Sequence, residues 1–307
     1  MRQALSFFVL LLVVAAVEAS ADITRTVIVM RHCVRTTPFT LDGEILSNFN
    51  DYSSLPFPEW KYPAWQCVPR GLDLIATQGA YLREKQPLAQ PLIKVVSDAI
   101  DRDIDTSHFL LQGLGEPSFP VVADGAIFDA QQGGVCPPDP VEWNDEMILL
   151  RLSQAPIPHH HRQLLNSLQA KLGRGIAPSF TNISDSANVS TFVGGSAVAA
   201  EIAGYFEMAA GSGIDMSWAN VTADDVRNML PLIVYQHNVW MRALPLAQHG
   251  HSNLLAHVLR DLDPVSPSGT SFYVGHDRCV LAFCILLHVS HLCDRTLKLE
   301  QRHRWLG

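Results

Sequence analysis

The chain has 307 residues, of which 48% are hydrophobic, enough to bury a substantial core in one large domain or two linked lobes. Its net charge of −8 argues against a nucleic-acid-binding protein, which needs a basic surface to face the phosphates. If the chain binds an anion, locally placed positive charge must overcome the negative charge of the whole.

The first 21 residues have the pattern of a secretory signal peptide. Arg2 precedes an unbroken apolar run at 7–17, and the small residues at 19–21 fit a cleavage site after Ala21. The run is short for a membrane span, so we expect no stable membrane insertion, with an uncleaved anchor as the alternative. The sequence therefore predicts a secreted protein, or one held in a secretory or lysosome-like compartment.

Sequons and cysteines fit the same compartment. Glycosylation is expected at three Asn-x-Ser/Thr sequons, which begin at Asn182, Asn188 and Asn220. Some of the six cysteines are expected to form disulfides there, although the sequence does not give their pairing.

The first predicted strand follows the signal segment directly. Residues 23–30 are dense in β-branched side chains and run straight into Arg31-His32-Cys33-Val34-Arg35. A long loop, a helix, a second short strand that ends near Arg102, and another helix are then expected at 36–65, 72–84, 94–98 and 106–114.

Helical spacing dominates the middle of the chain. Helices are expected at 145–152, 161–172, 196–210 and 223–246, the last broken near Pro231 and Pro245. A strand at 271–274 then ends in Gly275-His276-Asp277.

This order predicts an α/β fold with a mostly parallel sheet flanked by helices and an inserted, smaller all-helical lobe. We expect a discontinuous α/β domain over 22–138 and 220–307, with 139–219 as a helical cap lobe.

Charged side chains follow three of these predicted strands, and the ends of parallel strands meet at one edge of a sheet. The side chains are Arg31, His32 and Arg35, then Arg102, then His276 and Asp277. Phosphoryl transfer needs this set: guanidinium forks for the phosphate oxygens, an imidazole nucleophile, and a carboxylic acid for the leaving group. A phosphate site is therefore indicated without a metal or another cofactor.

The same residues resemble the histidine acid phosphatase family, which carries an Arg-His-Gly-x-Arg motif after its first strand and a late His-Asp pair. Residues 31–35 look like the first motif and 275–277 look like the second. Pro69-Arg70-Gly71 and the segment from Asp98 to Thr106 also have counterparts in the two-lobed branch, which contains phytases and periplasmic sugar-phosphate phosphatases. The resemblance covers about 23–280, so the C-terminal part of the α/β domain is expected to be incomplete.

The resemblance implies a role for each site residue. His32 would attack phosphorus and become a phosphohistidine, and Asp277 would protonate the leaving group, which suggests an acidic working pH. Arg31, Arg35, Arg102 and His276 would bind the phosphate oxygens. The partner would be a small-molecule phosphomonoester, and the sequence gives no oligomeric state.

Departures from the motif leave other readings open. Cys33 stands where the family has Gly, and its side chain would crowd the phosphate or strain the turn. The neighbouring cationic groups would favour the thiolate form of Cys33. Arg278 follows Asp277 and would favour the ionised carboxylate. A non-catalytic phosphate- or phosphosugar-binding protein is therefore the alternative, and a phosphomutase is disfavoured by the signal peptide.

Two further features are interpreted as structural. The histidines at 159–161 resemble a metal-binding tract, but we interpret them as part of a solvated turn. Asp101 and Asp103 flank Arg102 and are interpreted as partners that hold its guanidinium in place.

Overall fold

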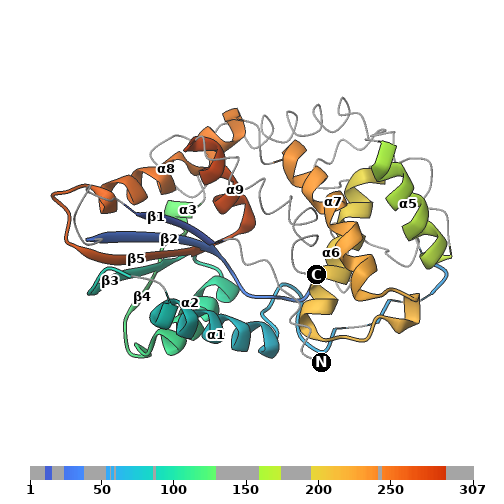
Figure 1. The fold of residues 1–307 in the computed structure, drawn as a ribbon, viewed down its shortest axis with the longest axis horizontal. Coiled ribbons are helices and arrows are strands. Elements are labelled where there is room, and N and C mark those ends of the chain that lie inside the picture. The colour runs from blue at the N-terminus through green and yellow to red at the C-terminus, as the bar shows by residue number, and fades with distance from the viewer. Residues whose placement is uncertain are drawn as a thin grey trace, which may run out of the picture. The chain divides into compact units, whose positions relative to one another are not determined.

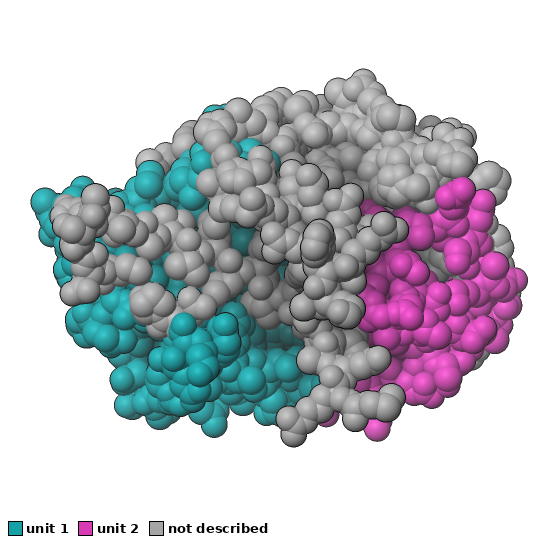
Figure 2. Space-filling model, viewed as in Figure 1, with its two compact units in different colours: residues 1–34, 69–138, 244–307 teal, residues 35–68, 139–243 magenta. Residues whose placement is uncertain are grey.

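The computed structural model of the chain describes residues 11–15, 24–37, 53–55, 57–58, 60–85, 88–128, 159–173, 195–240 and 244–287. The chain forms two compact units (Figure 2). Unit 1 comprises Met1–Val34, Pro69–Pro138 and Leu244–Gly307, whereas unit 2 comprises Arg35–Val68 and Asp139–Ala243. The expected helix at 145–152 and the sequons at Asn182 and Asn188 lie outside the described residues.

The predicted sheet lies in unit 1 and has the strand order β1-β2-β5-β3-β4 (Figure 1). Strands β2, β5, β3 and β4 are parallel neighbours in that order, as the fold class predicts. Their bounds are Arg25–Arg31, Gly269–Gly275, Leu92–Ser97 and Val121–Ala123. Because Arg31 pairs with Gly275 and Ser97 with Val274, the carboxyl ends of the three inner strands lie at one edge.

Strand β1, at Leu11–Ala15, comes from the segment that we expect to be a signal peptide. It pairs antiparallel with β2, with Leu11 opposite Met30 and Ala15 opposite Thr26. An apolar run of β-branched and aliphatic residues fits an edge strand as well as a signal segment. Cleavage after Ala21 stays a prediction.

Helices cover both faces of the sheet in unit 1 (Figure 1). Helices α1 and α2, at Pro69–Lys85 and Asp101–Leu114, lie on one face. Helices α3, α8 and α9, at Gly125–Phe128, Leu244–Leu262 and Asp277–Leu286, lie on the other. All seven residues of β5 are buried as a result, including the polar Thr270 and Ser271.

Alternate residues of β2 serve these two faces. Val27 and Val29 pack with Tyr273, Leu254 and Phe283 in the core beneath α8 and α9. Ile28 and Met30, the alternate residues, are equally buried. Burial on both faces fixes the register of β2 and therefore the position of Arg31 at its end.

Close contact between α1 and α2 depends on glycine. A Cβ built on Gly79 would lie 2.5 Å from the carbonyl oxygen of Leu110, and one on Gly113 would overlap the carbonyl of Ala76. The absent side chains let the two backbones approach, which holds the first turn of α2 against the sheet edge.

Unit 2 is helical around an aromatic core. Its described helices are α5, α6, the short 3₁₀ helix η4 and α7, at His159–Leu172, Gly195–Ser212, Ser217–Ala219 and Ala223–Trp240. The ring of Phe57 lies 5.1 Å from Tyr205 and 4.9 Å from Trp218, as edge-to-face pairs. Unit 2 includes residues 35–68 and 220–243, which the sequence analysis places in the α/β domain.

Two helices differ from their predicted bounds. Helix α7 runs through Pro231, where a break was expected, because Met229 and Leu232 on either side are buried in the unit 2 core. Helix α5 begins at His159, so the three histidines form its first turn rather than the solvated turn that was expected between helices. Helix α7 starts with a reciprocal pair of bonds between Thr222 and Asp225, the side chain of each accepting from the backbone N–H of the other.

Among the described helices, none has both the length and the apolar character needed to cross a membrane.

Candidate active site

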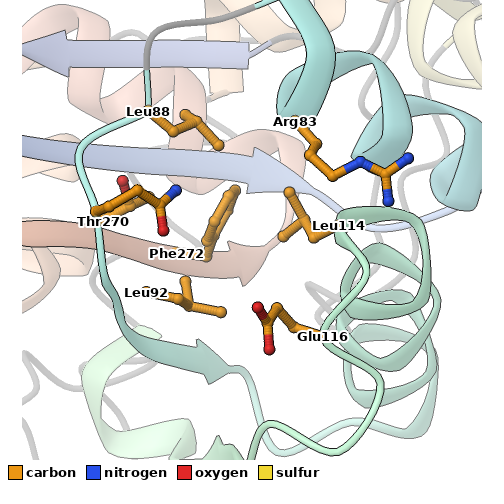
Figure 3. Close-up of a pocket in the computed structure, with 8 residues that line it drawn as sticks. Arg83, Leu88, Leu92, Leu114, Glu116, Thr270 and Phe272 are labelled. Atoms are coloured by element: carbon orange, nitrogen blue, oxygen red, sulfur yellow. The ribbon is translucent and has the colours of Figure 1, made fainter.

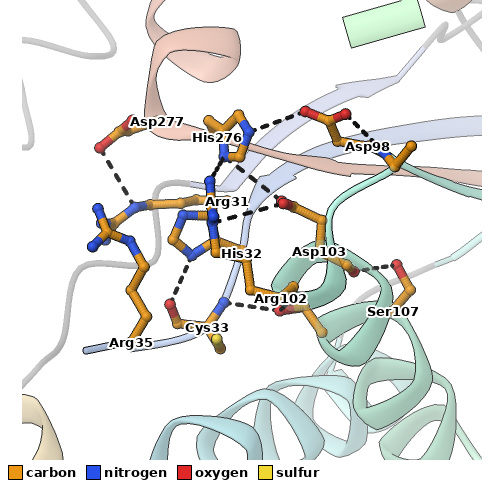
Figure 4. Close-up of polar contacts among 12 residues, drawn as sticks. Arg31, His32, Cys33, Arg35, Asp98, Arg102, Asp103, Ser107, His276 and Asp277 are labelled. Carbon is orange, nitrogen blue, oxygen red and sulfur yellow. Dashed lines mark hydrogen bonds and ion pairs between the residues drawn. The ribbon is translucent and has the colours of Figure 1, made fainter. Parts of the chain in front are cut away.

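Three sequence-distant segments meet at the carboxyl edge of the sheet in unit 1 (Figure 4). The backbone N–H of His32 donates to the carbonyl of Gly275 at 2.8 Å, which ties the end of β2 to the end of β5. The N–H of Asp98 donates to the carbonyl of Val274 at 2.9 Å, which ties the end of β3 to the same strand. Of the predicted site residues, this edge brings together Arg31, His32, Arg102, His276 and Asp277.

His32 is buried directly after β2, and its partner defines its tautomer. Its Nδ1 lies 2.9 Å from the carbonyl oxygen of Cys33. A carbonyl only accepts, so Nδ1 carries the proton and donates, and in the neutral ring the lone pair lies on Nε2. The His32 ring also meets the His276 ring edge-on, with centroids 5.4 Å apart.

Cys33 differs from the expectation of a reactive thiol. It is buried and disulfide-bonded, as are Cys67 and Cys284, so it has no thiolate to form. Its N–H donates to Thr106 Oγ1 at 2.9 Å, and that hydroxyl donates to the carbonyl of Arg102 at 2.6 Å. Cys33 is not among the residues with positive φ, so the turn accepts a side chain here without backbone strain.

Asp277 opens helix α9 and faces Arg31. Its Oδ2 lies 3.6 Å from Arg31 Nε, and its side chain is 34% exposed, so solvent reaches the carboxyl group. Its Oδ1 accepts the backbone N–H of Arg278 at 2.9 Å. One described partner of the predicted proton donor is therefore a predicted phosphate-binding arginine.

His276 lies between Asp98 and Arg102 with a defined partner on each nitrogen. Its Nε2 lies 3.0 Å from Asp98 Oδ2, and its Nδ1 lies 3.4 Å from Arg102 Nη2. Because a guanidinium only donates, Nδ1 accepts from Arg102 and Nε2–H donates to Asp98. Burial lowers the pKa of His276 despite the bond to Asp98, so the neutral ring is favoured.

Asp98 is the orienting residue that the sequence did not assign. It is 2% exposed, and the N–H of Ala99 donates to its Oδ1 at 2.7 Å. Burial alone would raise the pKa of Asp98, but the hydrogen bonds from His276 and the Ala99 N–H, together with the charge of Arg278, outweigh burial, and the pKa lies below its usual value. The ionised carboxylate therefore holds the His276 ring in place.

Arg102 and Asp103 lie in the first turn of α2, rather than at a strand end as expected. Arg102 Nε lies 3.8 Å from Asp103 Oδ2. Asp103 is fully buried, and burial raises its pKa to about 8 against the opposing charge of Arg102. Asp101, the other expected partner of Arg102, is exposed.

Arg35 is the one predicted site residue that belongs to unit 2. Its Nη1 donates to the carbonyl of Thr36 at 2.9 Å, and its guanidinium lies 4.2 Å from the centre of the Trp65 ring. Residue Arg35 also forms an isolated bridge with Cys67. Trp65 was not predicted from the sequence, because nothing in its spacing marks it as a partner of Arg35.

A metal is one possible use of the buried acidic groups. Asp98, Asp103 and His276 offer ligand atoms within 4.8 Å of one another. The guanidinium of Arg102 already contacts both Asp103 and His276, and its permanent charge opposes a second cation at the same place. The donor set therefore suits an arginine better than a metal ion.

A separate cavity of about 100 Å³ lies elsewhere in unit 1, at the amino ends of β3 and β5 (Figure 3). Its lining is Arg83, Leu88, Gln90, Leu92, Leu114, Glu116, Thr270 and Phe272. None of these residues belongs to the carboxyl edge, so the cavity is distinct from the candidate active site.

The candidate site thus places two described guanidiniums, those of Arg31 and Arg102, beside a buried imidazole with a lone pair on Nε2 and a partly exposed carboxyl group. This combination suits a tetrahedral oxyanion, because the guanidinium forks match its oxygens and the His32 imidazole could act as a nucleophile toward its central atom.

Comparison with known proteins finds solved structures with the same fold. No protein-family model and no curated protein matches the chain. Among solved structures, the apo phytase of Hafnia alvei matches with a TM-score of 0.68 and 20% identity, over 89% of this chain and 77% of that one. The same phytase in complex with myo-inositol hexakis sulphate gives 0.70 and 20%, over 89% and 76%.

Phytases from other organisms share the same architecture. The Citrobacter braakii phytase matches with a TM-score of 0.67 and 20% identity, over 86% of this chain and 75% of that one. The phytase from D. castellii gives 0.53 and 15%, over 85% and 61%. Over most of its length, the chain therefore has the α/β fold of bacterial and yeast phytases.

Proposed function

We propose that the protein is a metal-independent phosphomonoesterase that works through a phosphohistidine at His32. The observation that carries this proposal is the meeting of His32, Arg31, Arg102 and Asp277 at one sheet edge, from segments far apart in the sequence. The tautomer of His32, with its lone pair on Nε2, is the state that an attacking imidazole needs.

The proposed reaction has two steps. First, His32 Nε2 attacks phosphorus, the ester P–O bond breaks, and Asp277 gives its proton to the departing alkoxide. Second, water attacks the phosphorus, the P–N bond breaks, and the Asp277 carboxylate takes the proton from that water. Arg31 and Arg102 stabilise the charge on the phosphate oxygens in both steps, and we propose that Arg35 joins them.

Within this scheme His276 acts mainly on Arg102. Both of its ring nitrogens face protein groups, Asp98 on one side and Arg102 on the other. We propose that His276 orients the Arg102 guanidinium toward the phosphate, because in the assigned tautomer its Nδ1 carries no proton to donate to a phosphate oxygen.

The ion pair between Arg31 and Asp277 favours an acidic working pH. While Asp277 is ionised, it competes with phosphate for Arg31 at 3.6 Å and has no proton to give. Protonation of Asp277 removes the competition and supplies the acid in one event.

We propose an inositol phosphate or sugar phosphate as the substrate, by analogy with the fold. We also propose an extracytoplasmic location. Disulfide bonds at Cys33, Cys67 and Cys284 are typical of an oxidising compartment. The sequon at Asn220 is exposed, as glycosylation requires.

The same ion pair also supports a second candidate, a phosphate-binding protein without turnover. If Arg31 and Arg278 keep Asp277 ionised at every pH where the fold persists, an anion would bind but no leaving group would be protonated.

Turnover of p-nitrophenyl phosphate across acidic to neutral pH separates the two candidates. We expect activity that His32→Ala abolishes and that His108→Ala, an exposed histidine on α2, leaves intact. Sulfate binding without turnover at any pH would favour the binding protein. Equal activity in the wild type and His32→Ala would contradict the proposed mechanism.

A further inference from the structure

Asp103 is a buried carboxyl group that the proposed reaction does not use. Its side chain is 0% exposed, and neither Oδ1 nor Oδ2 has a hydrogen-bond partner among the described residues. Its nearest polar neighbours are Arg102 Nε, 3.8 Å from Oδ2, and His276 Nδ1, 3.8 Å from Oδ1 (Figure 4). Both separations are too long for hydrogen bonds.

A carboxylate in this position would be poorly stabilised. An ionised group that is buried without hydrogen bonds pays a large desolvation penalty and takes up a proton instead. Charged and titratable groups face Asp103 from the strand ends and from the helices beside them. They are Arg102 on α2, Asp98 after β3, Arg31 on β2, His276 after β5 and Arg278 on α9.

The balance among these groups favours the protonated acid below neutral pH. Burial raises the pKa of Asp103 to about 8, Asp98 adds to the effect, and Arg102, Arg278 and Arg31 oppose it. Asp103 is thus neutral across the acidic range in which Asp277 is proposed to work.

Ionisation of Asp103 would change which group the Arg102 guanidinium pairs with. A charged Asp103 lies about 1 Å beyond the usual length of a charge-assisted bond to Arg102 Nε, a distance that a small side-chain shift closes. Arg102 would then be paired with Asp103, and the negative charge beside it would repel an incoming oxyanion.

We propose that Asp103 is a positioning residue whose proton decides whether Arg102 is available to a bound phosphate, so that it sets the alkaline limit of oxyanion binding. This inference rests on the proposed phosphate site. It concerns the binding of a tetrahedral dianion at that site and does not depend on turnover.

Proton linkage makes the inference quantitative. Above the pKa of Asp103, the carboxylate must take up one proton from solution each time an anion binds, because the anion binds only to the protein with protonated Asp103. The dissociation constant of a dianion then rises by about ten-fold per pH unit until the liganded protein also ionises. Below that pKa, Asp103 contributes no pH dependence.

Sulfate is the probe, because it keeps the same charge from pH 6 to 10 and cannot be hydrolysed. Calorimetric titration of wild-type protein between about pH 6.5 and 9.5 brackets the pKa of Asp103. Asp103→Asn is the test variant, since the amide mimics the protonated acid in shape and charge. Asp105→Asn is the matched control, with the same charge change at an exposed position of α2.

We expect the wild type and Asp105→Asn to lose affinity for sulfate by about ten-fold or more over this range, with uptake of one proton per sulfate at the alkaline end. Asp103→Asn should bind with nearly constant affinity and without that proton uptake. Proton uptake is measured by repeating the titration in buffers that differ in ionisation enthalpy.

Parallel pH curves in the wild type and Asp103→Asn would overturn the inference while leaving the anion site intact. Absence of sulfate binding to either protein at every pH would overturn the proposed phosphate site, and the inference with it. A second readout checks that Asp103 holds a proton: the free energy of unfolding should fall as pH rises from about 4 to 8 in the wild type, and less steeply in Asp103→Asn.

Discussion

The bond between Asp98 and His276 gives the sharpest test of how the site is built. Its Nε2–Oδ2 distance is 3.0 Å, and both side chains are more than nine-tenths buried. Two substitutions of Asp98 separate the contribution of the hydrogen bond to stability from that of the negative charge. Asp98→Ala removes the acceptor entirely, whereas Asp98→Asn keeps a side-chain oxygen that accepts from Nε2–H.

The structure sets the size of each effect. Asp98→Ala leaves the Nε2–H of His276 buried without a partner and also removes the bond from the Ala99 N–H, so we expect a loss of about 2–4 kcal/mol in the free energy of unfolding. Asp98→Asn exchanges a charged acceptor for a neutral one, and we expect a loss of about 1–1.5 kcal/mol.

The direction of the pH dependence follows from the depressed pKa of Asp98. A carboxyl group whose folded pKa lies below its unfolded value stabilises the fold above the unfolded value, which is about 3.9. That stabilisation is lost as pH falls through the folded pKa. The difference between the wild type and Asp98→Asn should therefore be full at neutral pH and shrink below about pH 4.

Urea denaturation of a double-mutant cycle with His276→Ala measures the bond itself. We expect a coupling energy of about 1–2 kcal/mol between Asp98 and His276 at neutral pH. Additive losses in the cycle, or an Asp98→Asn variant as unstable as Asp98→Ala, would refute the assigned tautomer of His276 and the orienting role of Asp98.

Away from the site, Asp261→Ala removes the partner of both Lys94 Nζ, at 2.7 Å, and the Tyr273 hydroxyl, at 2.9 Å. We expect a loss of about 2–3 kcal/mol by urea denaturation with sulfate affinity unchanged, and a loss below about 0.5 kcal/mol would contradict the contact. Gly113→Ala places a methyl group against the backbone of α1 and should cost about 1–3 kcal/mol. Gly250→Ala in α8 meets open space and should instead stabilise the fold by about 0.5–1 kcal/mol; equal effects of the two glycine variants would contradict the close packing of α1 and α2.

The central strands were predictable because strands buried on both faces appear in the sequence as short runs of apolar and β-branched residues. Strand β2 was expected at 23–30 and lies at Arg25–Arg31, and β5 was expected at 271–274 and lies at Gly269–Gly275. In each case the apolar run ends where the chain reaches the sheet edge, so the charged residues that follow were placed correctly at that edge.

The unit to which residues 35–68 belong and the strand at residues 11–15 depend on tertiary packing, which local sequence patterns do not reveal. Residues 35–68 show no periodicity, yet Phe57 and Trp60 pack in the aromatic core of unit 2, which assigns this segment to the helical part. The strand β1 arises from an apolar run whose composition fits a signal peptide equally well. Composition does not distinguish these alternatives, because an edge strand and a signal segment both favour apolar and β-branched residues.

Adjacent charged residues were the hardest to interpret. Asp101 and Asp103 have the same spacing from Arg102, but Asp101 is exposed and Asp103 is fully buried. The difference depends on how α2 rotates against the sheet, which is set by the contact of α2 with α1. Likewise, the pairing of Arg35 with Trp65 depends on a residue with φ of 67°, an unusual conformation for tryptophan that no local pattern indicates.

Direct detection of the covalent intermediate tests the central claim. The protein would be mixed with p-nitrophenyl phosphate, quenched in alkali to preserve a phosphohistidine, digested, and analysed by mass spectrometry. The account predicts phosphate on His32, with more of it in Asp277→Asn if that variant slows the second step more than the first. Turnover without phosphate on His32, or phosphate on another residue in its place, would contradict the account.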